Sequence, residues 1–144
     1  MLSDMSVQPE YIFFTDRNLG KQFPNALKSA GIRVEKHNDH FADDARDEVW
    51  LTEIGKRGWY ALTYDRRIRY KPNEKNAVKK FRVGLFVLVG KLPISKLAEN
   101  FVLTLPKIQK FIDKNPRPFI AKIYHSYKEN KTGSVEMWES FSKH

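Results

Sequence analysis

Residues 83–89 (VGLFVLV) form an almost continuous run of apolar side chains. A strand of this composition is buried on both faces, as in a parallel sheet that helices cover on both sides. Residues 11–15 (YIFFT) and 60–64 (YALTY) are shorter runs of the same character, and each is followed directly by an aspartate, Asp16 and Asp65. The three runs predict the inner strands of an α/β fold, and the alternating residues 32–37 predict a less buried strand.

Apolar residues at helical spacing separate these strands. Residues 19–30 predict a first helix, and a second is expected to run to Arg57 after a cap at Asp43 or Asp44. The inner stripe expected of this second helix consists of Val49, Trp50 and Ile54. Residues 95–113 predict a long helix, which Pro106 should kink or divide because proline removes an internal hydrogen bond.

Residues 119–127 and 134–138 flank an Asn-Lys-Thr-Gly turn and predict an antiparallel hairpin at the edge of the sheet. Strands that alternate with helices imply right-handed crossovers. The expected fold is therefore a three-layer α/β/α domain with a mainly parallel central sheet. We expect one domain, residues 11–144, preceded by an N-terminal extension, residues 1–10.

The composition is that of a globular protein, with 41% hydrophobic and 30% charged residues. There is no cysteine, which excludes disulfides and thiolate metal sites and fits a reducing cytoplasm. The first apolar run is too short for a signal peptide or a membrane span, so we expect a cytoplasmic protein without membrane association.

The net charge of +9 is unevenly distributed. Residues 1–60 carry 8 basic and 10 acidic side chains, whereas residues 61–144 carry 18 and 7. Residues 66–82 alone hold eight basic side chains against one acid, Glu74. Such clustering is expected of a protein that contacts nucleic-acid phosphates, although a solvated helix face would have the same composition.

Asp16, Asp47 and Asp65 are the candidate catalytic and metal-binding residues. Asp16 and Asp65 follow strands that are expected to be parallel, so both should emerge at the same edge of the sheet, where such folds bind ligands. Asp47 lies three and seven residues before Trp50 and Ile54, which places it on the inward face of the second helix. Three converging carboxylates need a compensating cation, and Mg²⁺ or Mn²⁺ prefers oxygen ligands.

The simpler interpretation of each aspartate is helix capping, because a strand, an aspartate and a helix commonly follow one another. Asp47 fits it less well, because Asp43 or Asp44 could already cap that helix. Glu48 is expected to face solvent, but a shift of one residue in the helical phase would exchange it with Asp47. Other chemistry has little support. The histidines lack metal-pair spacing, and neither a nucleophile elbow nor a glycine-rich phosphate loop is present.

The stretch FTDRNLG, residues 14–20, resembles the opening of PIN-like domains, in which an aspartate ends the first strand. Residues 47–51 (DEVWL) and 58–65 (GWYALTYD) resemble their second and third acidic motifs, so that the resemblance covers about residues 11–90. Similar small proteins are VapC-type toxins of toxin-antitoxin pairs. The resemblance implies a cytoplasmic Mg²⁺-dependent or Mn²⁺-dependent endoribonuclease that dimerises and is silenced by an antitoxin protein.

The resemblance also implies metal coordination by Asp16, Asp47 and Asp65, with Thr63 as a polar neighbour. Many PIN domains place a fourth acid two residues after the third, and here that position is Arg67. A site with three acids can still bind one metal ion, a second ion would lack this ligand, and an inactive descendant of the family is the alternative. The residues expected to bind substrate phosphates are Arg66, Arg67, Arg69 and Lys71, together with Thr63.

An RNA endonuclease is the leading hypothesis for the function. A catalytically silent nucleic-acid-binding module of the same fold is the second, and it would keep the basic segment without metal-dependent turnover. A receiver-like phosphotransfer or phosphatase domain is the third, because that fold also places aspartates at strand ends. It would require paired acids after the first strand and a lysine at a strand end, and both are missing here.

Overall fold

A computed structural model describes residues 11–141, and the predicted N-terminal extension, residues 1–10, lies outside this range. Six strands form one sheet in the order β3-β2-β4-β5-β6-β7. The first five in this order are parallel, and β7 pairs with β6 in the antiparallel direction. The strands are β2 (Ile12–Thr15), β3 (Arg33–Lys36), β4 (Tyr60–Thr63), β5 (Gly84–Val89), β6 (Phe119–Tyr124) and β7 (Ser134–Ser140).

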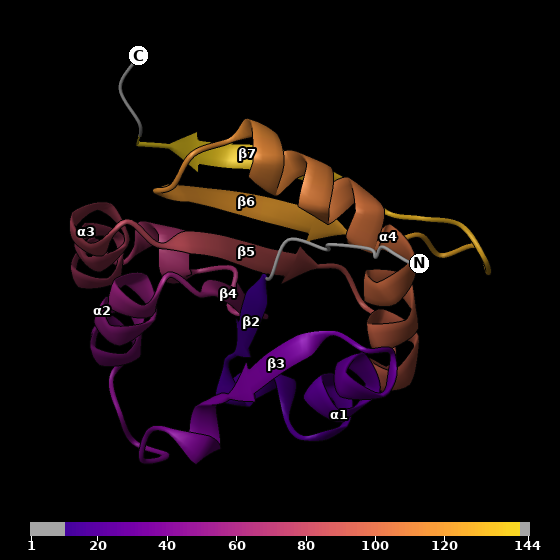
Figure 1. Cartoon of the computed structure of the whole chain (residues 1–144), viewed down its shortest axis with the longest axis horizontal. Coiled ribbons are helices and arrows are strands. Elements are labelled where there is room, and N and C mark those ends of the chain that lie inside the picture. Colours follow the sequence, from indigo (N-terminus) through magenta and orange to yellow (C-terminus); the bar gives the residue numbers. More distant parts are fainter. Residues whose placement is uncertain (1–10, 142–144) are drawn as a thin grey trace, which may run out of the picture.

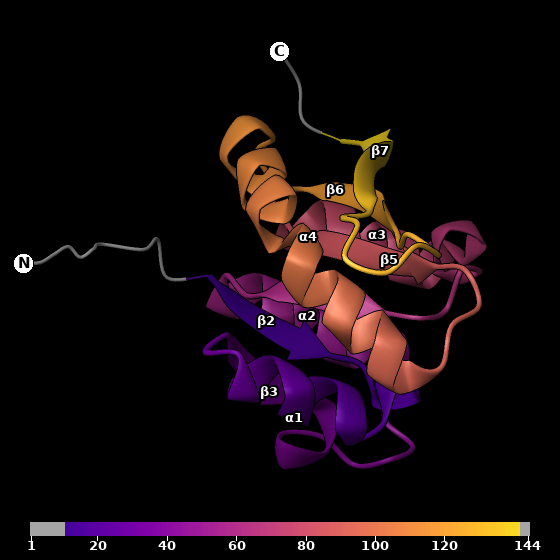
Figure 2. The ribbon, with the colours of Figure 1, turned by 90° about the vertical axis from the view of Figure 1, so that its right-hand side faces the viewer.

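Two helices cover each face of the sheet, as Figures 1 and 2 show. Helices α1 (Gln22–Ser29) and α4 (Ile94–Lys114) pack on one face, in a core that contains Phe13, Phe86 and Phe101. Helices α2 (Asp47–Arg57) and α3 (Pro72–Phe81) pack on the other face, against Phe14 and Leu85. The three-layer α/β/α architecture and the C-terminal edge hairpin are confirmed. No helix within residues 11–141 is long and apolar enough to cross a membrane.

The first helix begins later than expected. A 3-10 turn, η1 (Arg17–Leu19), follows β2, and Gly20 with φ of 67° separates it from α1. This backbone conformation favours glycine and interrupts the helix that the apolar spacing predicts from residue 19.

The second helix also begins later, at Asp47 itself. Its N-cap is Arg46 in an extended conformation, so the prediction of a cap at Asp43 or Asp44 is wrong. Val49 was expected on the inner stripe but is 45% exposed, while Trp50, Leu51 and Ile54 are fully buried. The buried face of α2 is thus rotated toward Leu51 relative to the prediction. Glu48 is half-buried, and its carboxylate lies 3.4 Å from Arg46.

The basic segment folds into structure that the charge pattern did not predict. A 3-10 turn, η3 (Ile68–Tyr70), leads into α3, which has Pro72 in its first turn and buries Ala77 and Val78. Pro106 lies inside α4 and does not divide it, although Figure 2 shows that the two halves of the helix run in different directions.

Candidate active site

The candidate site lies where the crossovers of the sheet change direction. The chain leaves β2 toward β3 on one side, whereas β4 pairs with β2 on the other side and leads on to β5. Thr15 of β2 is in register with Leu62 of β4, and the N–H of Asp16 donates to the carbonyl of Leu62 at 2.9 Å. Asp16 and Asp65 therefore emerge side by side at the carboxyl edge of the sheet, which is where ligands bind in such folds.

Asp16 is a buried carboxylate that neutral groups hold in place. The backbone N–H of Arg17 donates to Oδ1 at 2.8 Å, and the Thr63 hydroxyl donates to Oδ2 at 2.8 Å. Only 4% of Asp16 is exposed. Burial raises the pKa of Asp16, the hydrogen bond from Thr63 opposes this rise, and the negative charge of Asp47 adds to it. The Asp16 carboxylate therefore lacks full compensation for its charge.

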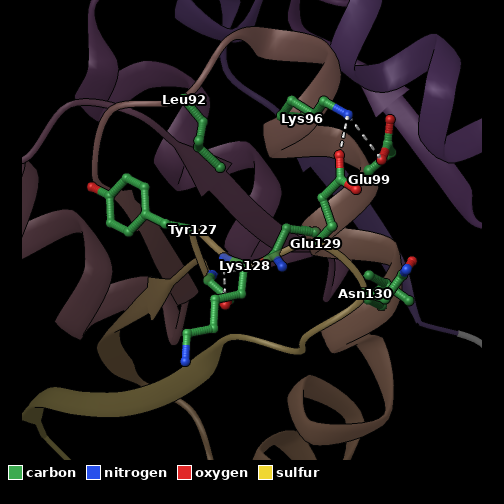
Figure 3. A pocket seen from close by; sticks show the side chains of 10 residues that line it. Leu92, Lys96, Glu99, Tyr127, Lys128, Glu129 and Asn130 are labelled. Atoms are coloured by element: carbon green, nitrogen blue, oxygen red, sulfur yellow. Dashed lines mark hydrogen bonds and ion pairs between the residues drawn. The ribbon is translucent and has the colours of Figure 1, made fainter.

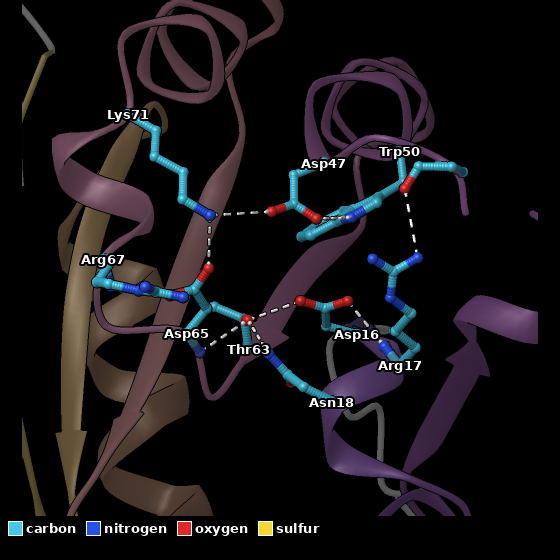
Figure 4. A network of polar contacts seen from close by, with 10 residues as sticks. Asp16, Arg17, Asn18, Asp47, Trp50, Thr63, Asp65, Arg67 and Lys71 are labelled. Carbon is cyan, nitrogen blue, oxygen red and sulfur yellow. Dashed lines mark hydrogen bonds and ion pairs between the residues drawn. The ribbon is translucent and has the colours of Figure 1, made fainter. Parts of the chain in front are cut away.

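Asp47 opens helix α2, where the positive end of the helix dipole favours a carboxylate. The Trp50 indole Nε1 donates to Asp47 Oδ1 at 2.9 Å, so the tryptophan is both core and support for the site. This bond fixes the orientation of Asp47, which lies on the side of α2 nearest Asp16 and Asp65 (Figure 4). The Glu48 carboxylate instead lies 3.4 Å from Arg46.

Asp65 is held by basic groups that follow it in the chain. The Lys71 ammonium lies 3.0 Å from Asp65 Oδ2, and the backbone N–H of Arg67 donates to Oδ1 at 2.9 Å. Burial alone would raise the pKa of Asp65, but the hydrogen bonds from Lys71 and Arg67 outweigh it and lower the pKa. The same ammonium lies 3.8 Å from Asp47 Oδ2 and so bridges two of the three aspartates.

Thr63 and Asn18 connect the two strand ends. Thr63 Oγ1 accepts hydrogen bonds from Asn18 Nδ2 and from the N–H of Asp65, both at 3.2 Å, while it donates to Asp16. Asn18 Oδ1 in turn accepts from the N–H of Tyr64 at 3.1 Å. Asn18 was not predicted as a site residue, although it lies in the FTDRNLG motif. Its position two residues after Asp16 was the available signal.

The donor chemistry of this site fits a hard divalent cation, because its charged ligands are carboxylate oxygens alone and the charge of Asp16 is undercompensated. The oxygens are not gathered into a closed cage. Among residues 11–141, no three His, Cys, Asp or Glu side chains form a group that could hold a metal ion. The ammonium of Lys71 instead lies beside two of the aspartates (Figure 4).

The residues predicted to bind substrate lie in different surroundings. Arg66 is exposed and the Arg67 side chain is 85% exposed, so both are accessible near Asp65. Arg69 is instead engaged with β7, where it pairs with Glu139 at 3.2 Å and packs over the Trp138 ring at 4.8 Å. Lys71 and Thr63 contact the aspartates themselves. Their predicted roles in substrate binding remain predictions.

A cavity of about 490 Å³ adjoins Asp16 and is lined partly by basic side chains, including Arg17, Lys21 and Lys36. A second cavity of about 200 Å³ lies between α4 and the loop that follows β6 (Figure 3). There Lys96 pairs with Glu99 and Glu129, at 3.9 and 3.7 Å, so its charge is already balanced. Of these two cavities, only the one beside Asp16 is lined by a residue of the candidate site.

Comparison with known families matches residues 11–90 to a family described as PIN like domain. The matched region runs from the start of β2 to just beyond β5 and contains all three aspartates. No curated protein and no solved structure matches the chain.

Proposed function

The chain belongs to the PIN-like domain family, whose members are generally nucleases, and from this premise we propose that it is a metal-dependent endoribonuclease. The observation that supports the proposal is that Asp16 after β2, Asp47 at the start of α2 and Asp65 after β4 all lie at the carboxyl edge of the sheet. Helix capping alone does not explain why the three aspartates lie at the same edge of the sheet. Only Asp16 caps a neighbouring element, the short turn η1.

Asp16, Asp47 and Asp65 would hold Mg²⁺ or Mn²⁺. Such an ion, when bound, supplies an activated water and polarises the phosphoryl oxygens of the substrate. The other residues act on geometry: Thr63 orients Asp16, Trp50 orients Asp47, and Asn18 orients Thr63. Arg66 and Arg67 are exposed, Arg67 lies 3.7 Å from Asp65 Oδ1, and both would meet the phosphates of an RNA strand there.

Labelled RNA incubated with the protein and Mn²⁺ tests this function, with EDTA and the variant Asp16→Asn as controls. Cleavage that requires Mn²⁺ and is lost in the variant supports the nuclease. Binding of RNA without Mn²⁺-dependent cleavage would instead support the second candidate, a silent nucleic-acid-binding module. Two features favour this alternative: Arg67 occupies the place of the usual fourth acid, and Lys71 contacts two of the aspartates.

We further propose that this nuclease is the toxin of a toxin-antitoxin pair, acting in the cytoplasm as a homodimer that an antitoxin protein silences. The support is the resemblance of its three acidic motifs to those of VapC-type toxins. Induced expression in bacteria tests it. Growth arrest with the wild type and normal growth with Asp16→Asn are expected, and equal growth of both strains would contradict the toxin role.

A further inference from the structure

Lys71 has an unusual position for a surface cation, because its ammonium lies between carboxylates from two different elements. It is 3.0 Å from Asp65 Oδ2 and 3.8 Å from Asp47 Oδ2 (Figure 4). Both aspartate side chains are only 17% exposed, so solvent screens these contacts less than at an open surface. An ammonium group here occupies the space toward which both carboxylates point.

The backbone of Lys71 is fixed, which makes this placement a property of the fold. Lys71 is the N-cap residue of α3, and its carbonyl accepts from the N–H of Lys75 at 2.9 Å. Its own N–H donates to the carbonyl of Ile68 at 3.3 Å. The side chain is 36% exposed, so its end can leave the carboxylates for solvent without any change in the backbone.

We propose that the Lys71 ammonium is an internal counter-cation that competes with a divalent ion for Asp47 and Asp65. The proposal rests on the metal site of the proposed function and adds what controls that site. A divalent ion bound by these aspartates would lie within a few ångströms of the ammonium, where the repulsion between the two positive charges is strong. Metal binding therefore requires Lys71 to move away, which weakens metal affinity.

After it leaves the carboxylates, the Lys71 ammonium would lie near the substrate phosphates. Lys71 follows Arg66 and Arg67 in the chain, which are the exposed cations beside Asp65. A substrate phosphate near Asp65 would attract the released ammonium and favour its departure from the carboxylates. Phosphate binding and metal binding then strengthen each other, as reciprocal coupling between two ligands requires.

Lys75 provides a matched control for this proposal. It lies one helical turn from Lys71, its side chain is 37% exposed, and it forms an ion pair of 2.7 Å with Glu139. Lys71→Met and Lys75→Met thus remove the same charge from similarly exposed positions and both keep a long apolar stem. Only Lys71 contacts the aspartates of the site.

Calorimetric titration with Mn²⁺ at fixed pH and ionic strength tests the competition. Lys71→Met should bind Mn²⁺ about tenfold more tightly than the wild type or more, because a positive charge at contact distance is removed. Lys75→Met should stay within about threefold of the wild type, since its charge is farther away and screened. Thermal melting checks that each variant folds, and Lys71→Gln serves as a second variant should Lys71→Met not fold.

Asp47→Asn, introduced into the wild type and into Lys71→Met, distinguishes failure of the proposed competition from failure of the proposed metal site. If Asp47→Asn abolishes Mn²⁺ binding but Lys71→Met binds no more tightly than Lys75→Met, the competition is refuted and the metal site stands. If neither wild type nor Lys71→Met binds Mn²⁺, or if Asp47→Asn changes nothing, the metal site of the proposed function fails. Binding by Lys71→Met alone would mean that Lys71 excludes the metal completely.

Discussion

The Thr63 hydroxyl donates a hydrogen bond of 2.8 Å to Asp16 Oδ2, which ties the end of β4 to the end of β2. Thr63 is fully buried and Asp16 almost so. The bond therefore links two neighbouring strands at the point where their carboxylates emerge. The Arg17 N–H donates to the other oxygen of Asp16, and the two bonds together keep the carboxylate in one orientation.

Thr63→Val keeps the shape of the side chain and removes this hydroxyl. We expect a loss of about 1–3 kcal/mol in the free energy of unfolding, because a buried carboxylate and the Asn18 amide both lose a partner. Urea denaturation measures the change. Thr52→Val is the control, since the Thr52 hydroxyl bonds to the Glu48 carbonyl within its own helix and not to a site residue described in the structure. Equal losses in both variants would contradict a special role for Thr63.

The pKa of Asp16 predicts how stability depends on pH without metal. Because its folded pKa is raised above the ordinary value of 3.8, the folded state holds the proton more tightly than the unfolded state. The resulting stabilisation is full below pH 3.8 and is lost as the pH rises through the folded pKa. Asp16→Asn should therefore gain stability relative to the wild type as the pH rises through this window.

Denaturation curves measured from about pH 3.5, near the ordinary pKa of an aspartate, up to about pH 7 give this difference in stability. Asp44→Asn, the same substitution at an exposed aspartate, is the control for the change itself. A stability difference for Asp16→Asn that stays flat across the range would mean that the fold does not raise the pKa of Asp16.

Mn²⁺ should raise the melting temperature of the wild type, because an ion that binds only the folded state stabilises it by mass action. Asp47→Asn should lose most of this gain, while Glu48→Gln, a change at the adjacent residue, should keep it. Differential scanning fluorimetry with EDTA and with Mn²⁺ measures both effects. An equal metal-dependent gain in Asp47→Asn and the wild type would remove Asp47 from the metal site.

Tyr70 is predicted to stack on an RNA base. It is 69% exposed, its ring meets Trp138 edge-on at 6.1 Å, and the Arg69 guanidinium lies 5.5 Å from its centre. Stacking of a base on an aromatic side chain contributes about 1–3 kcal/mol, so Tyr70→Ala should weaken binding of single-stranded RNA by about fivefold or more. The salt dependence should not change, because no phosphate contact is lost.

Tyr127→Ala is the control for Tyr70→Ala, since Tyr127 is 71% exposed but lines the cavity beside α4. Fluorescence anisotropy with a labelled oligonucleotide at several salt concentrations measures the affinity. If both tyrosine variants bind RNA like the wild type, Tyr70 is not a stacking platform.

Gly55 sets the distance between α2 and α3. A Cβ at this position would lie 2.3 Å from the Phe81 carbonyl oxygen, so Gly55→Ala must push the two helices apart. We expect a destabilisation of about 1–3 kcal/mol, the usual range for overpacking. Urea denaturation is the measurement, with Glu53→Ala on the same helix as control. A neutral Gly55→Ala would show that the helices can separate at little cost.

The sequence predicts the central sheet because residues 83–89 and the two shorter apolar runs have the length and composition of buried strands. The placement of Asp16 and Asp65 follows from the parallel pairing of these strands. Helix boundaries were less predictable. The start of α2 depends on the extended backbone at Arg46, which no cap residue marks. The contacts of Lys71 with Asp47 and Asp65 depend on where α3 docks, and the charge pattern of that segment does not contain this information.

The pairing of β5 with β6 has a consequence for shortened forms of the protein. The family match ends at residue 90, just beyond β5, and all three aspartates precede that point. Yet all six residues of β5, the most apolar strand, pair with β6 along its second edge. A chain cut after residue 90 would expose a row of unpaired N–H and C=O groups on this strand, an open template for self-association. The C-terminal segment thus covers this edge of β5, and a shortened form keeps that cover only if it includes β6.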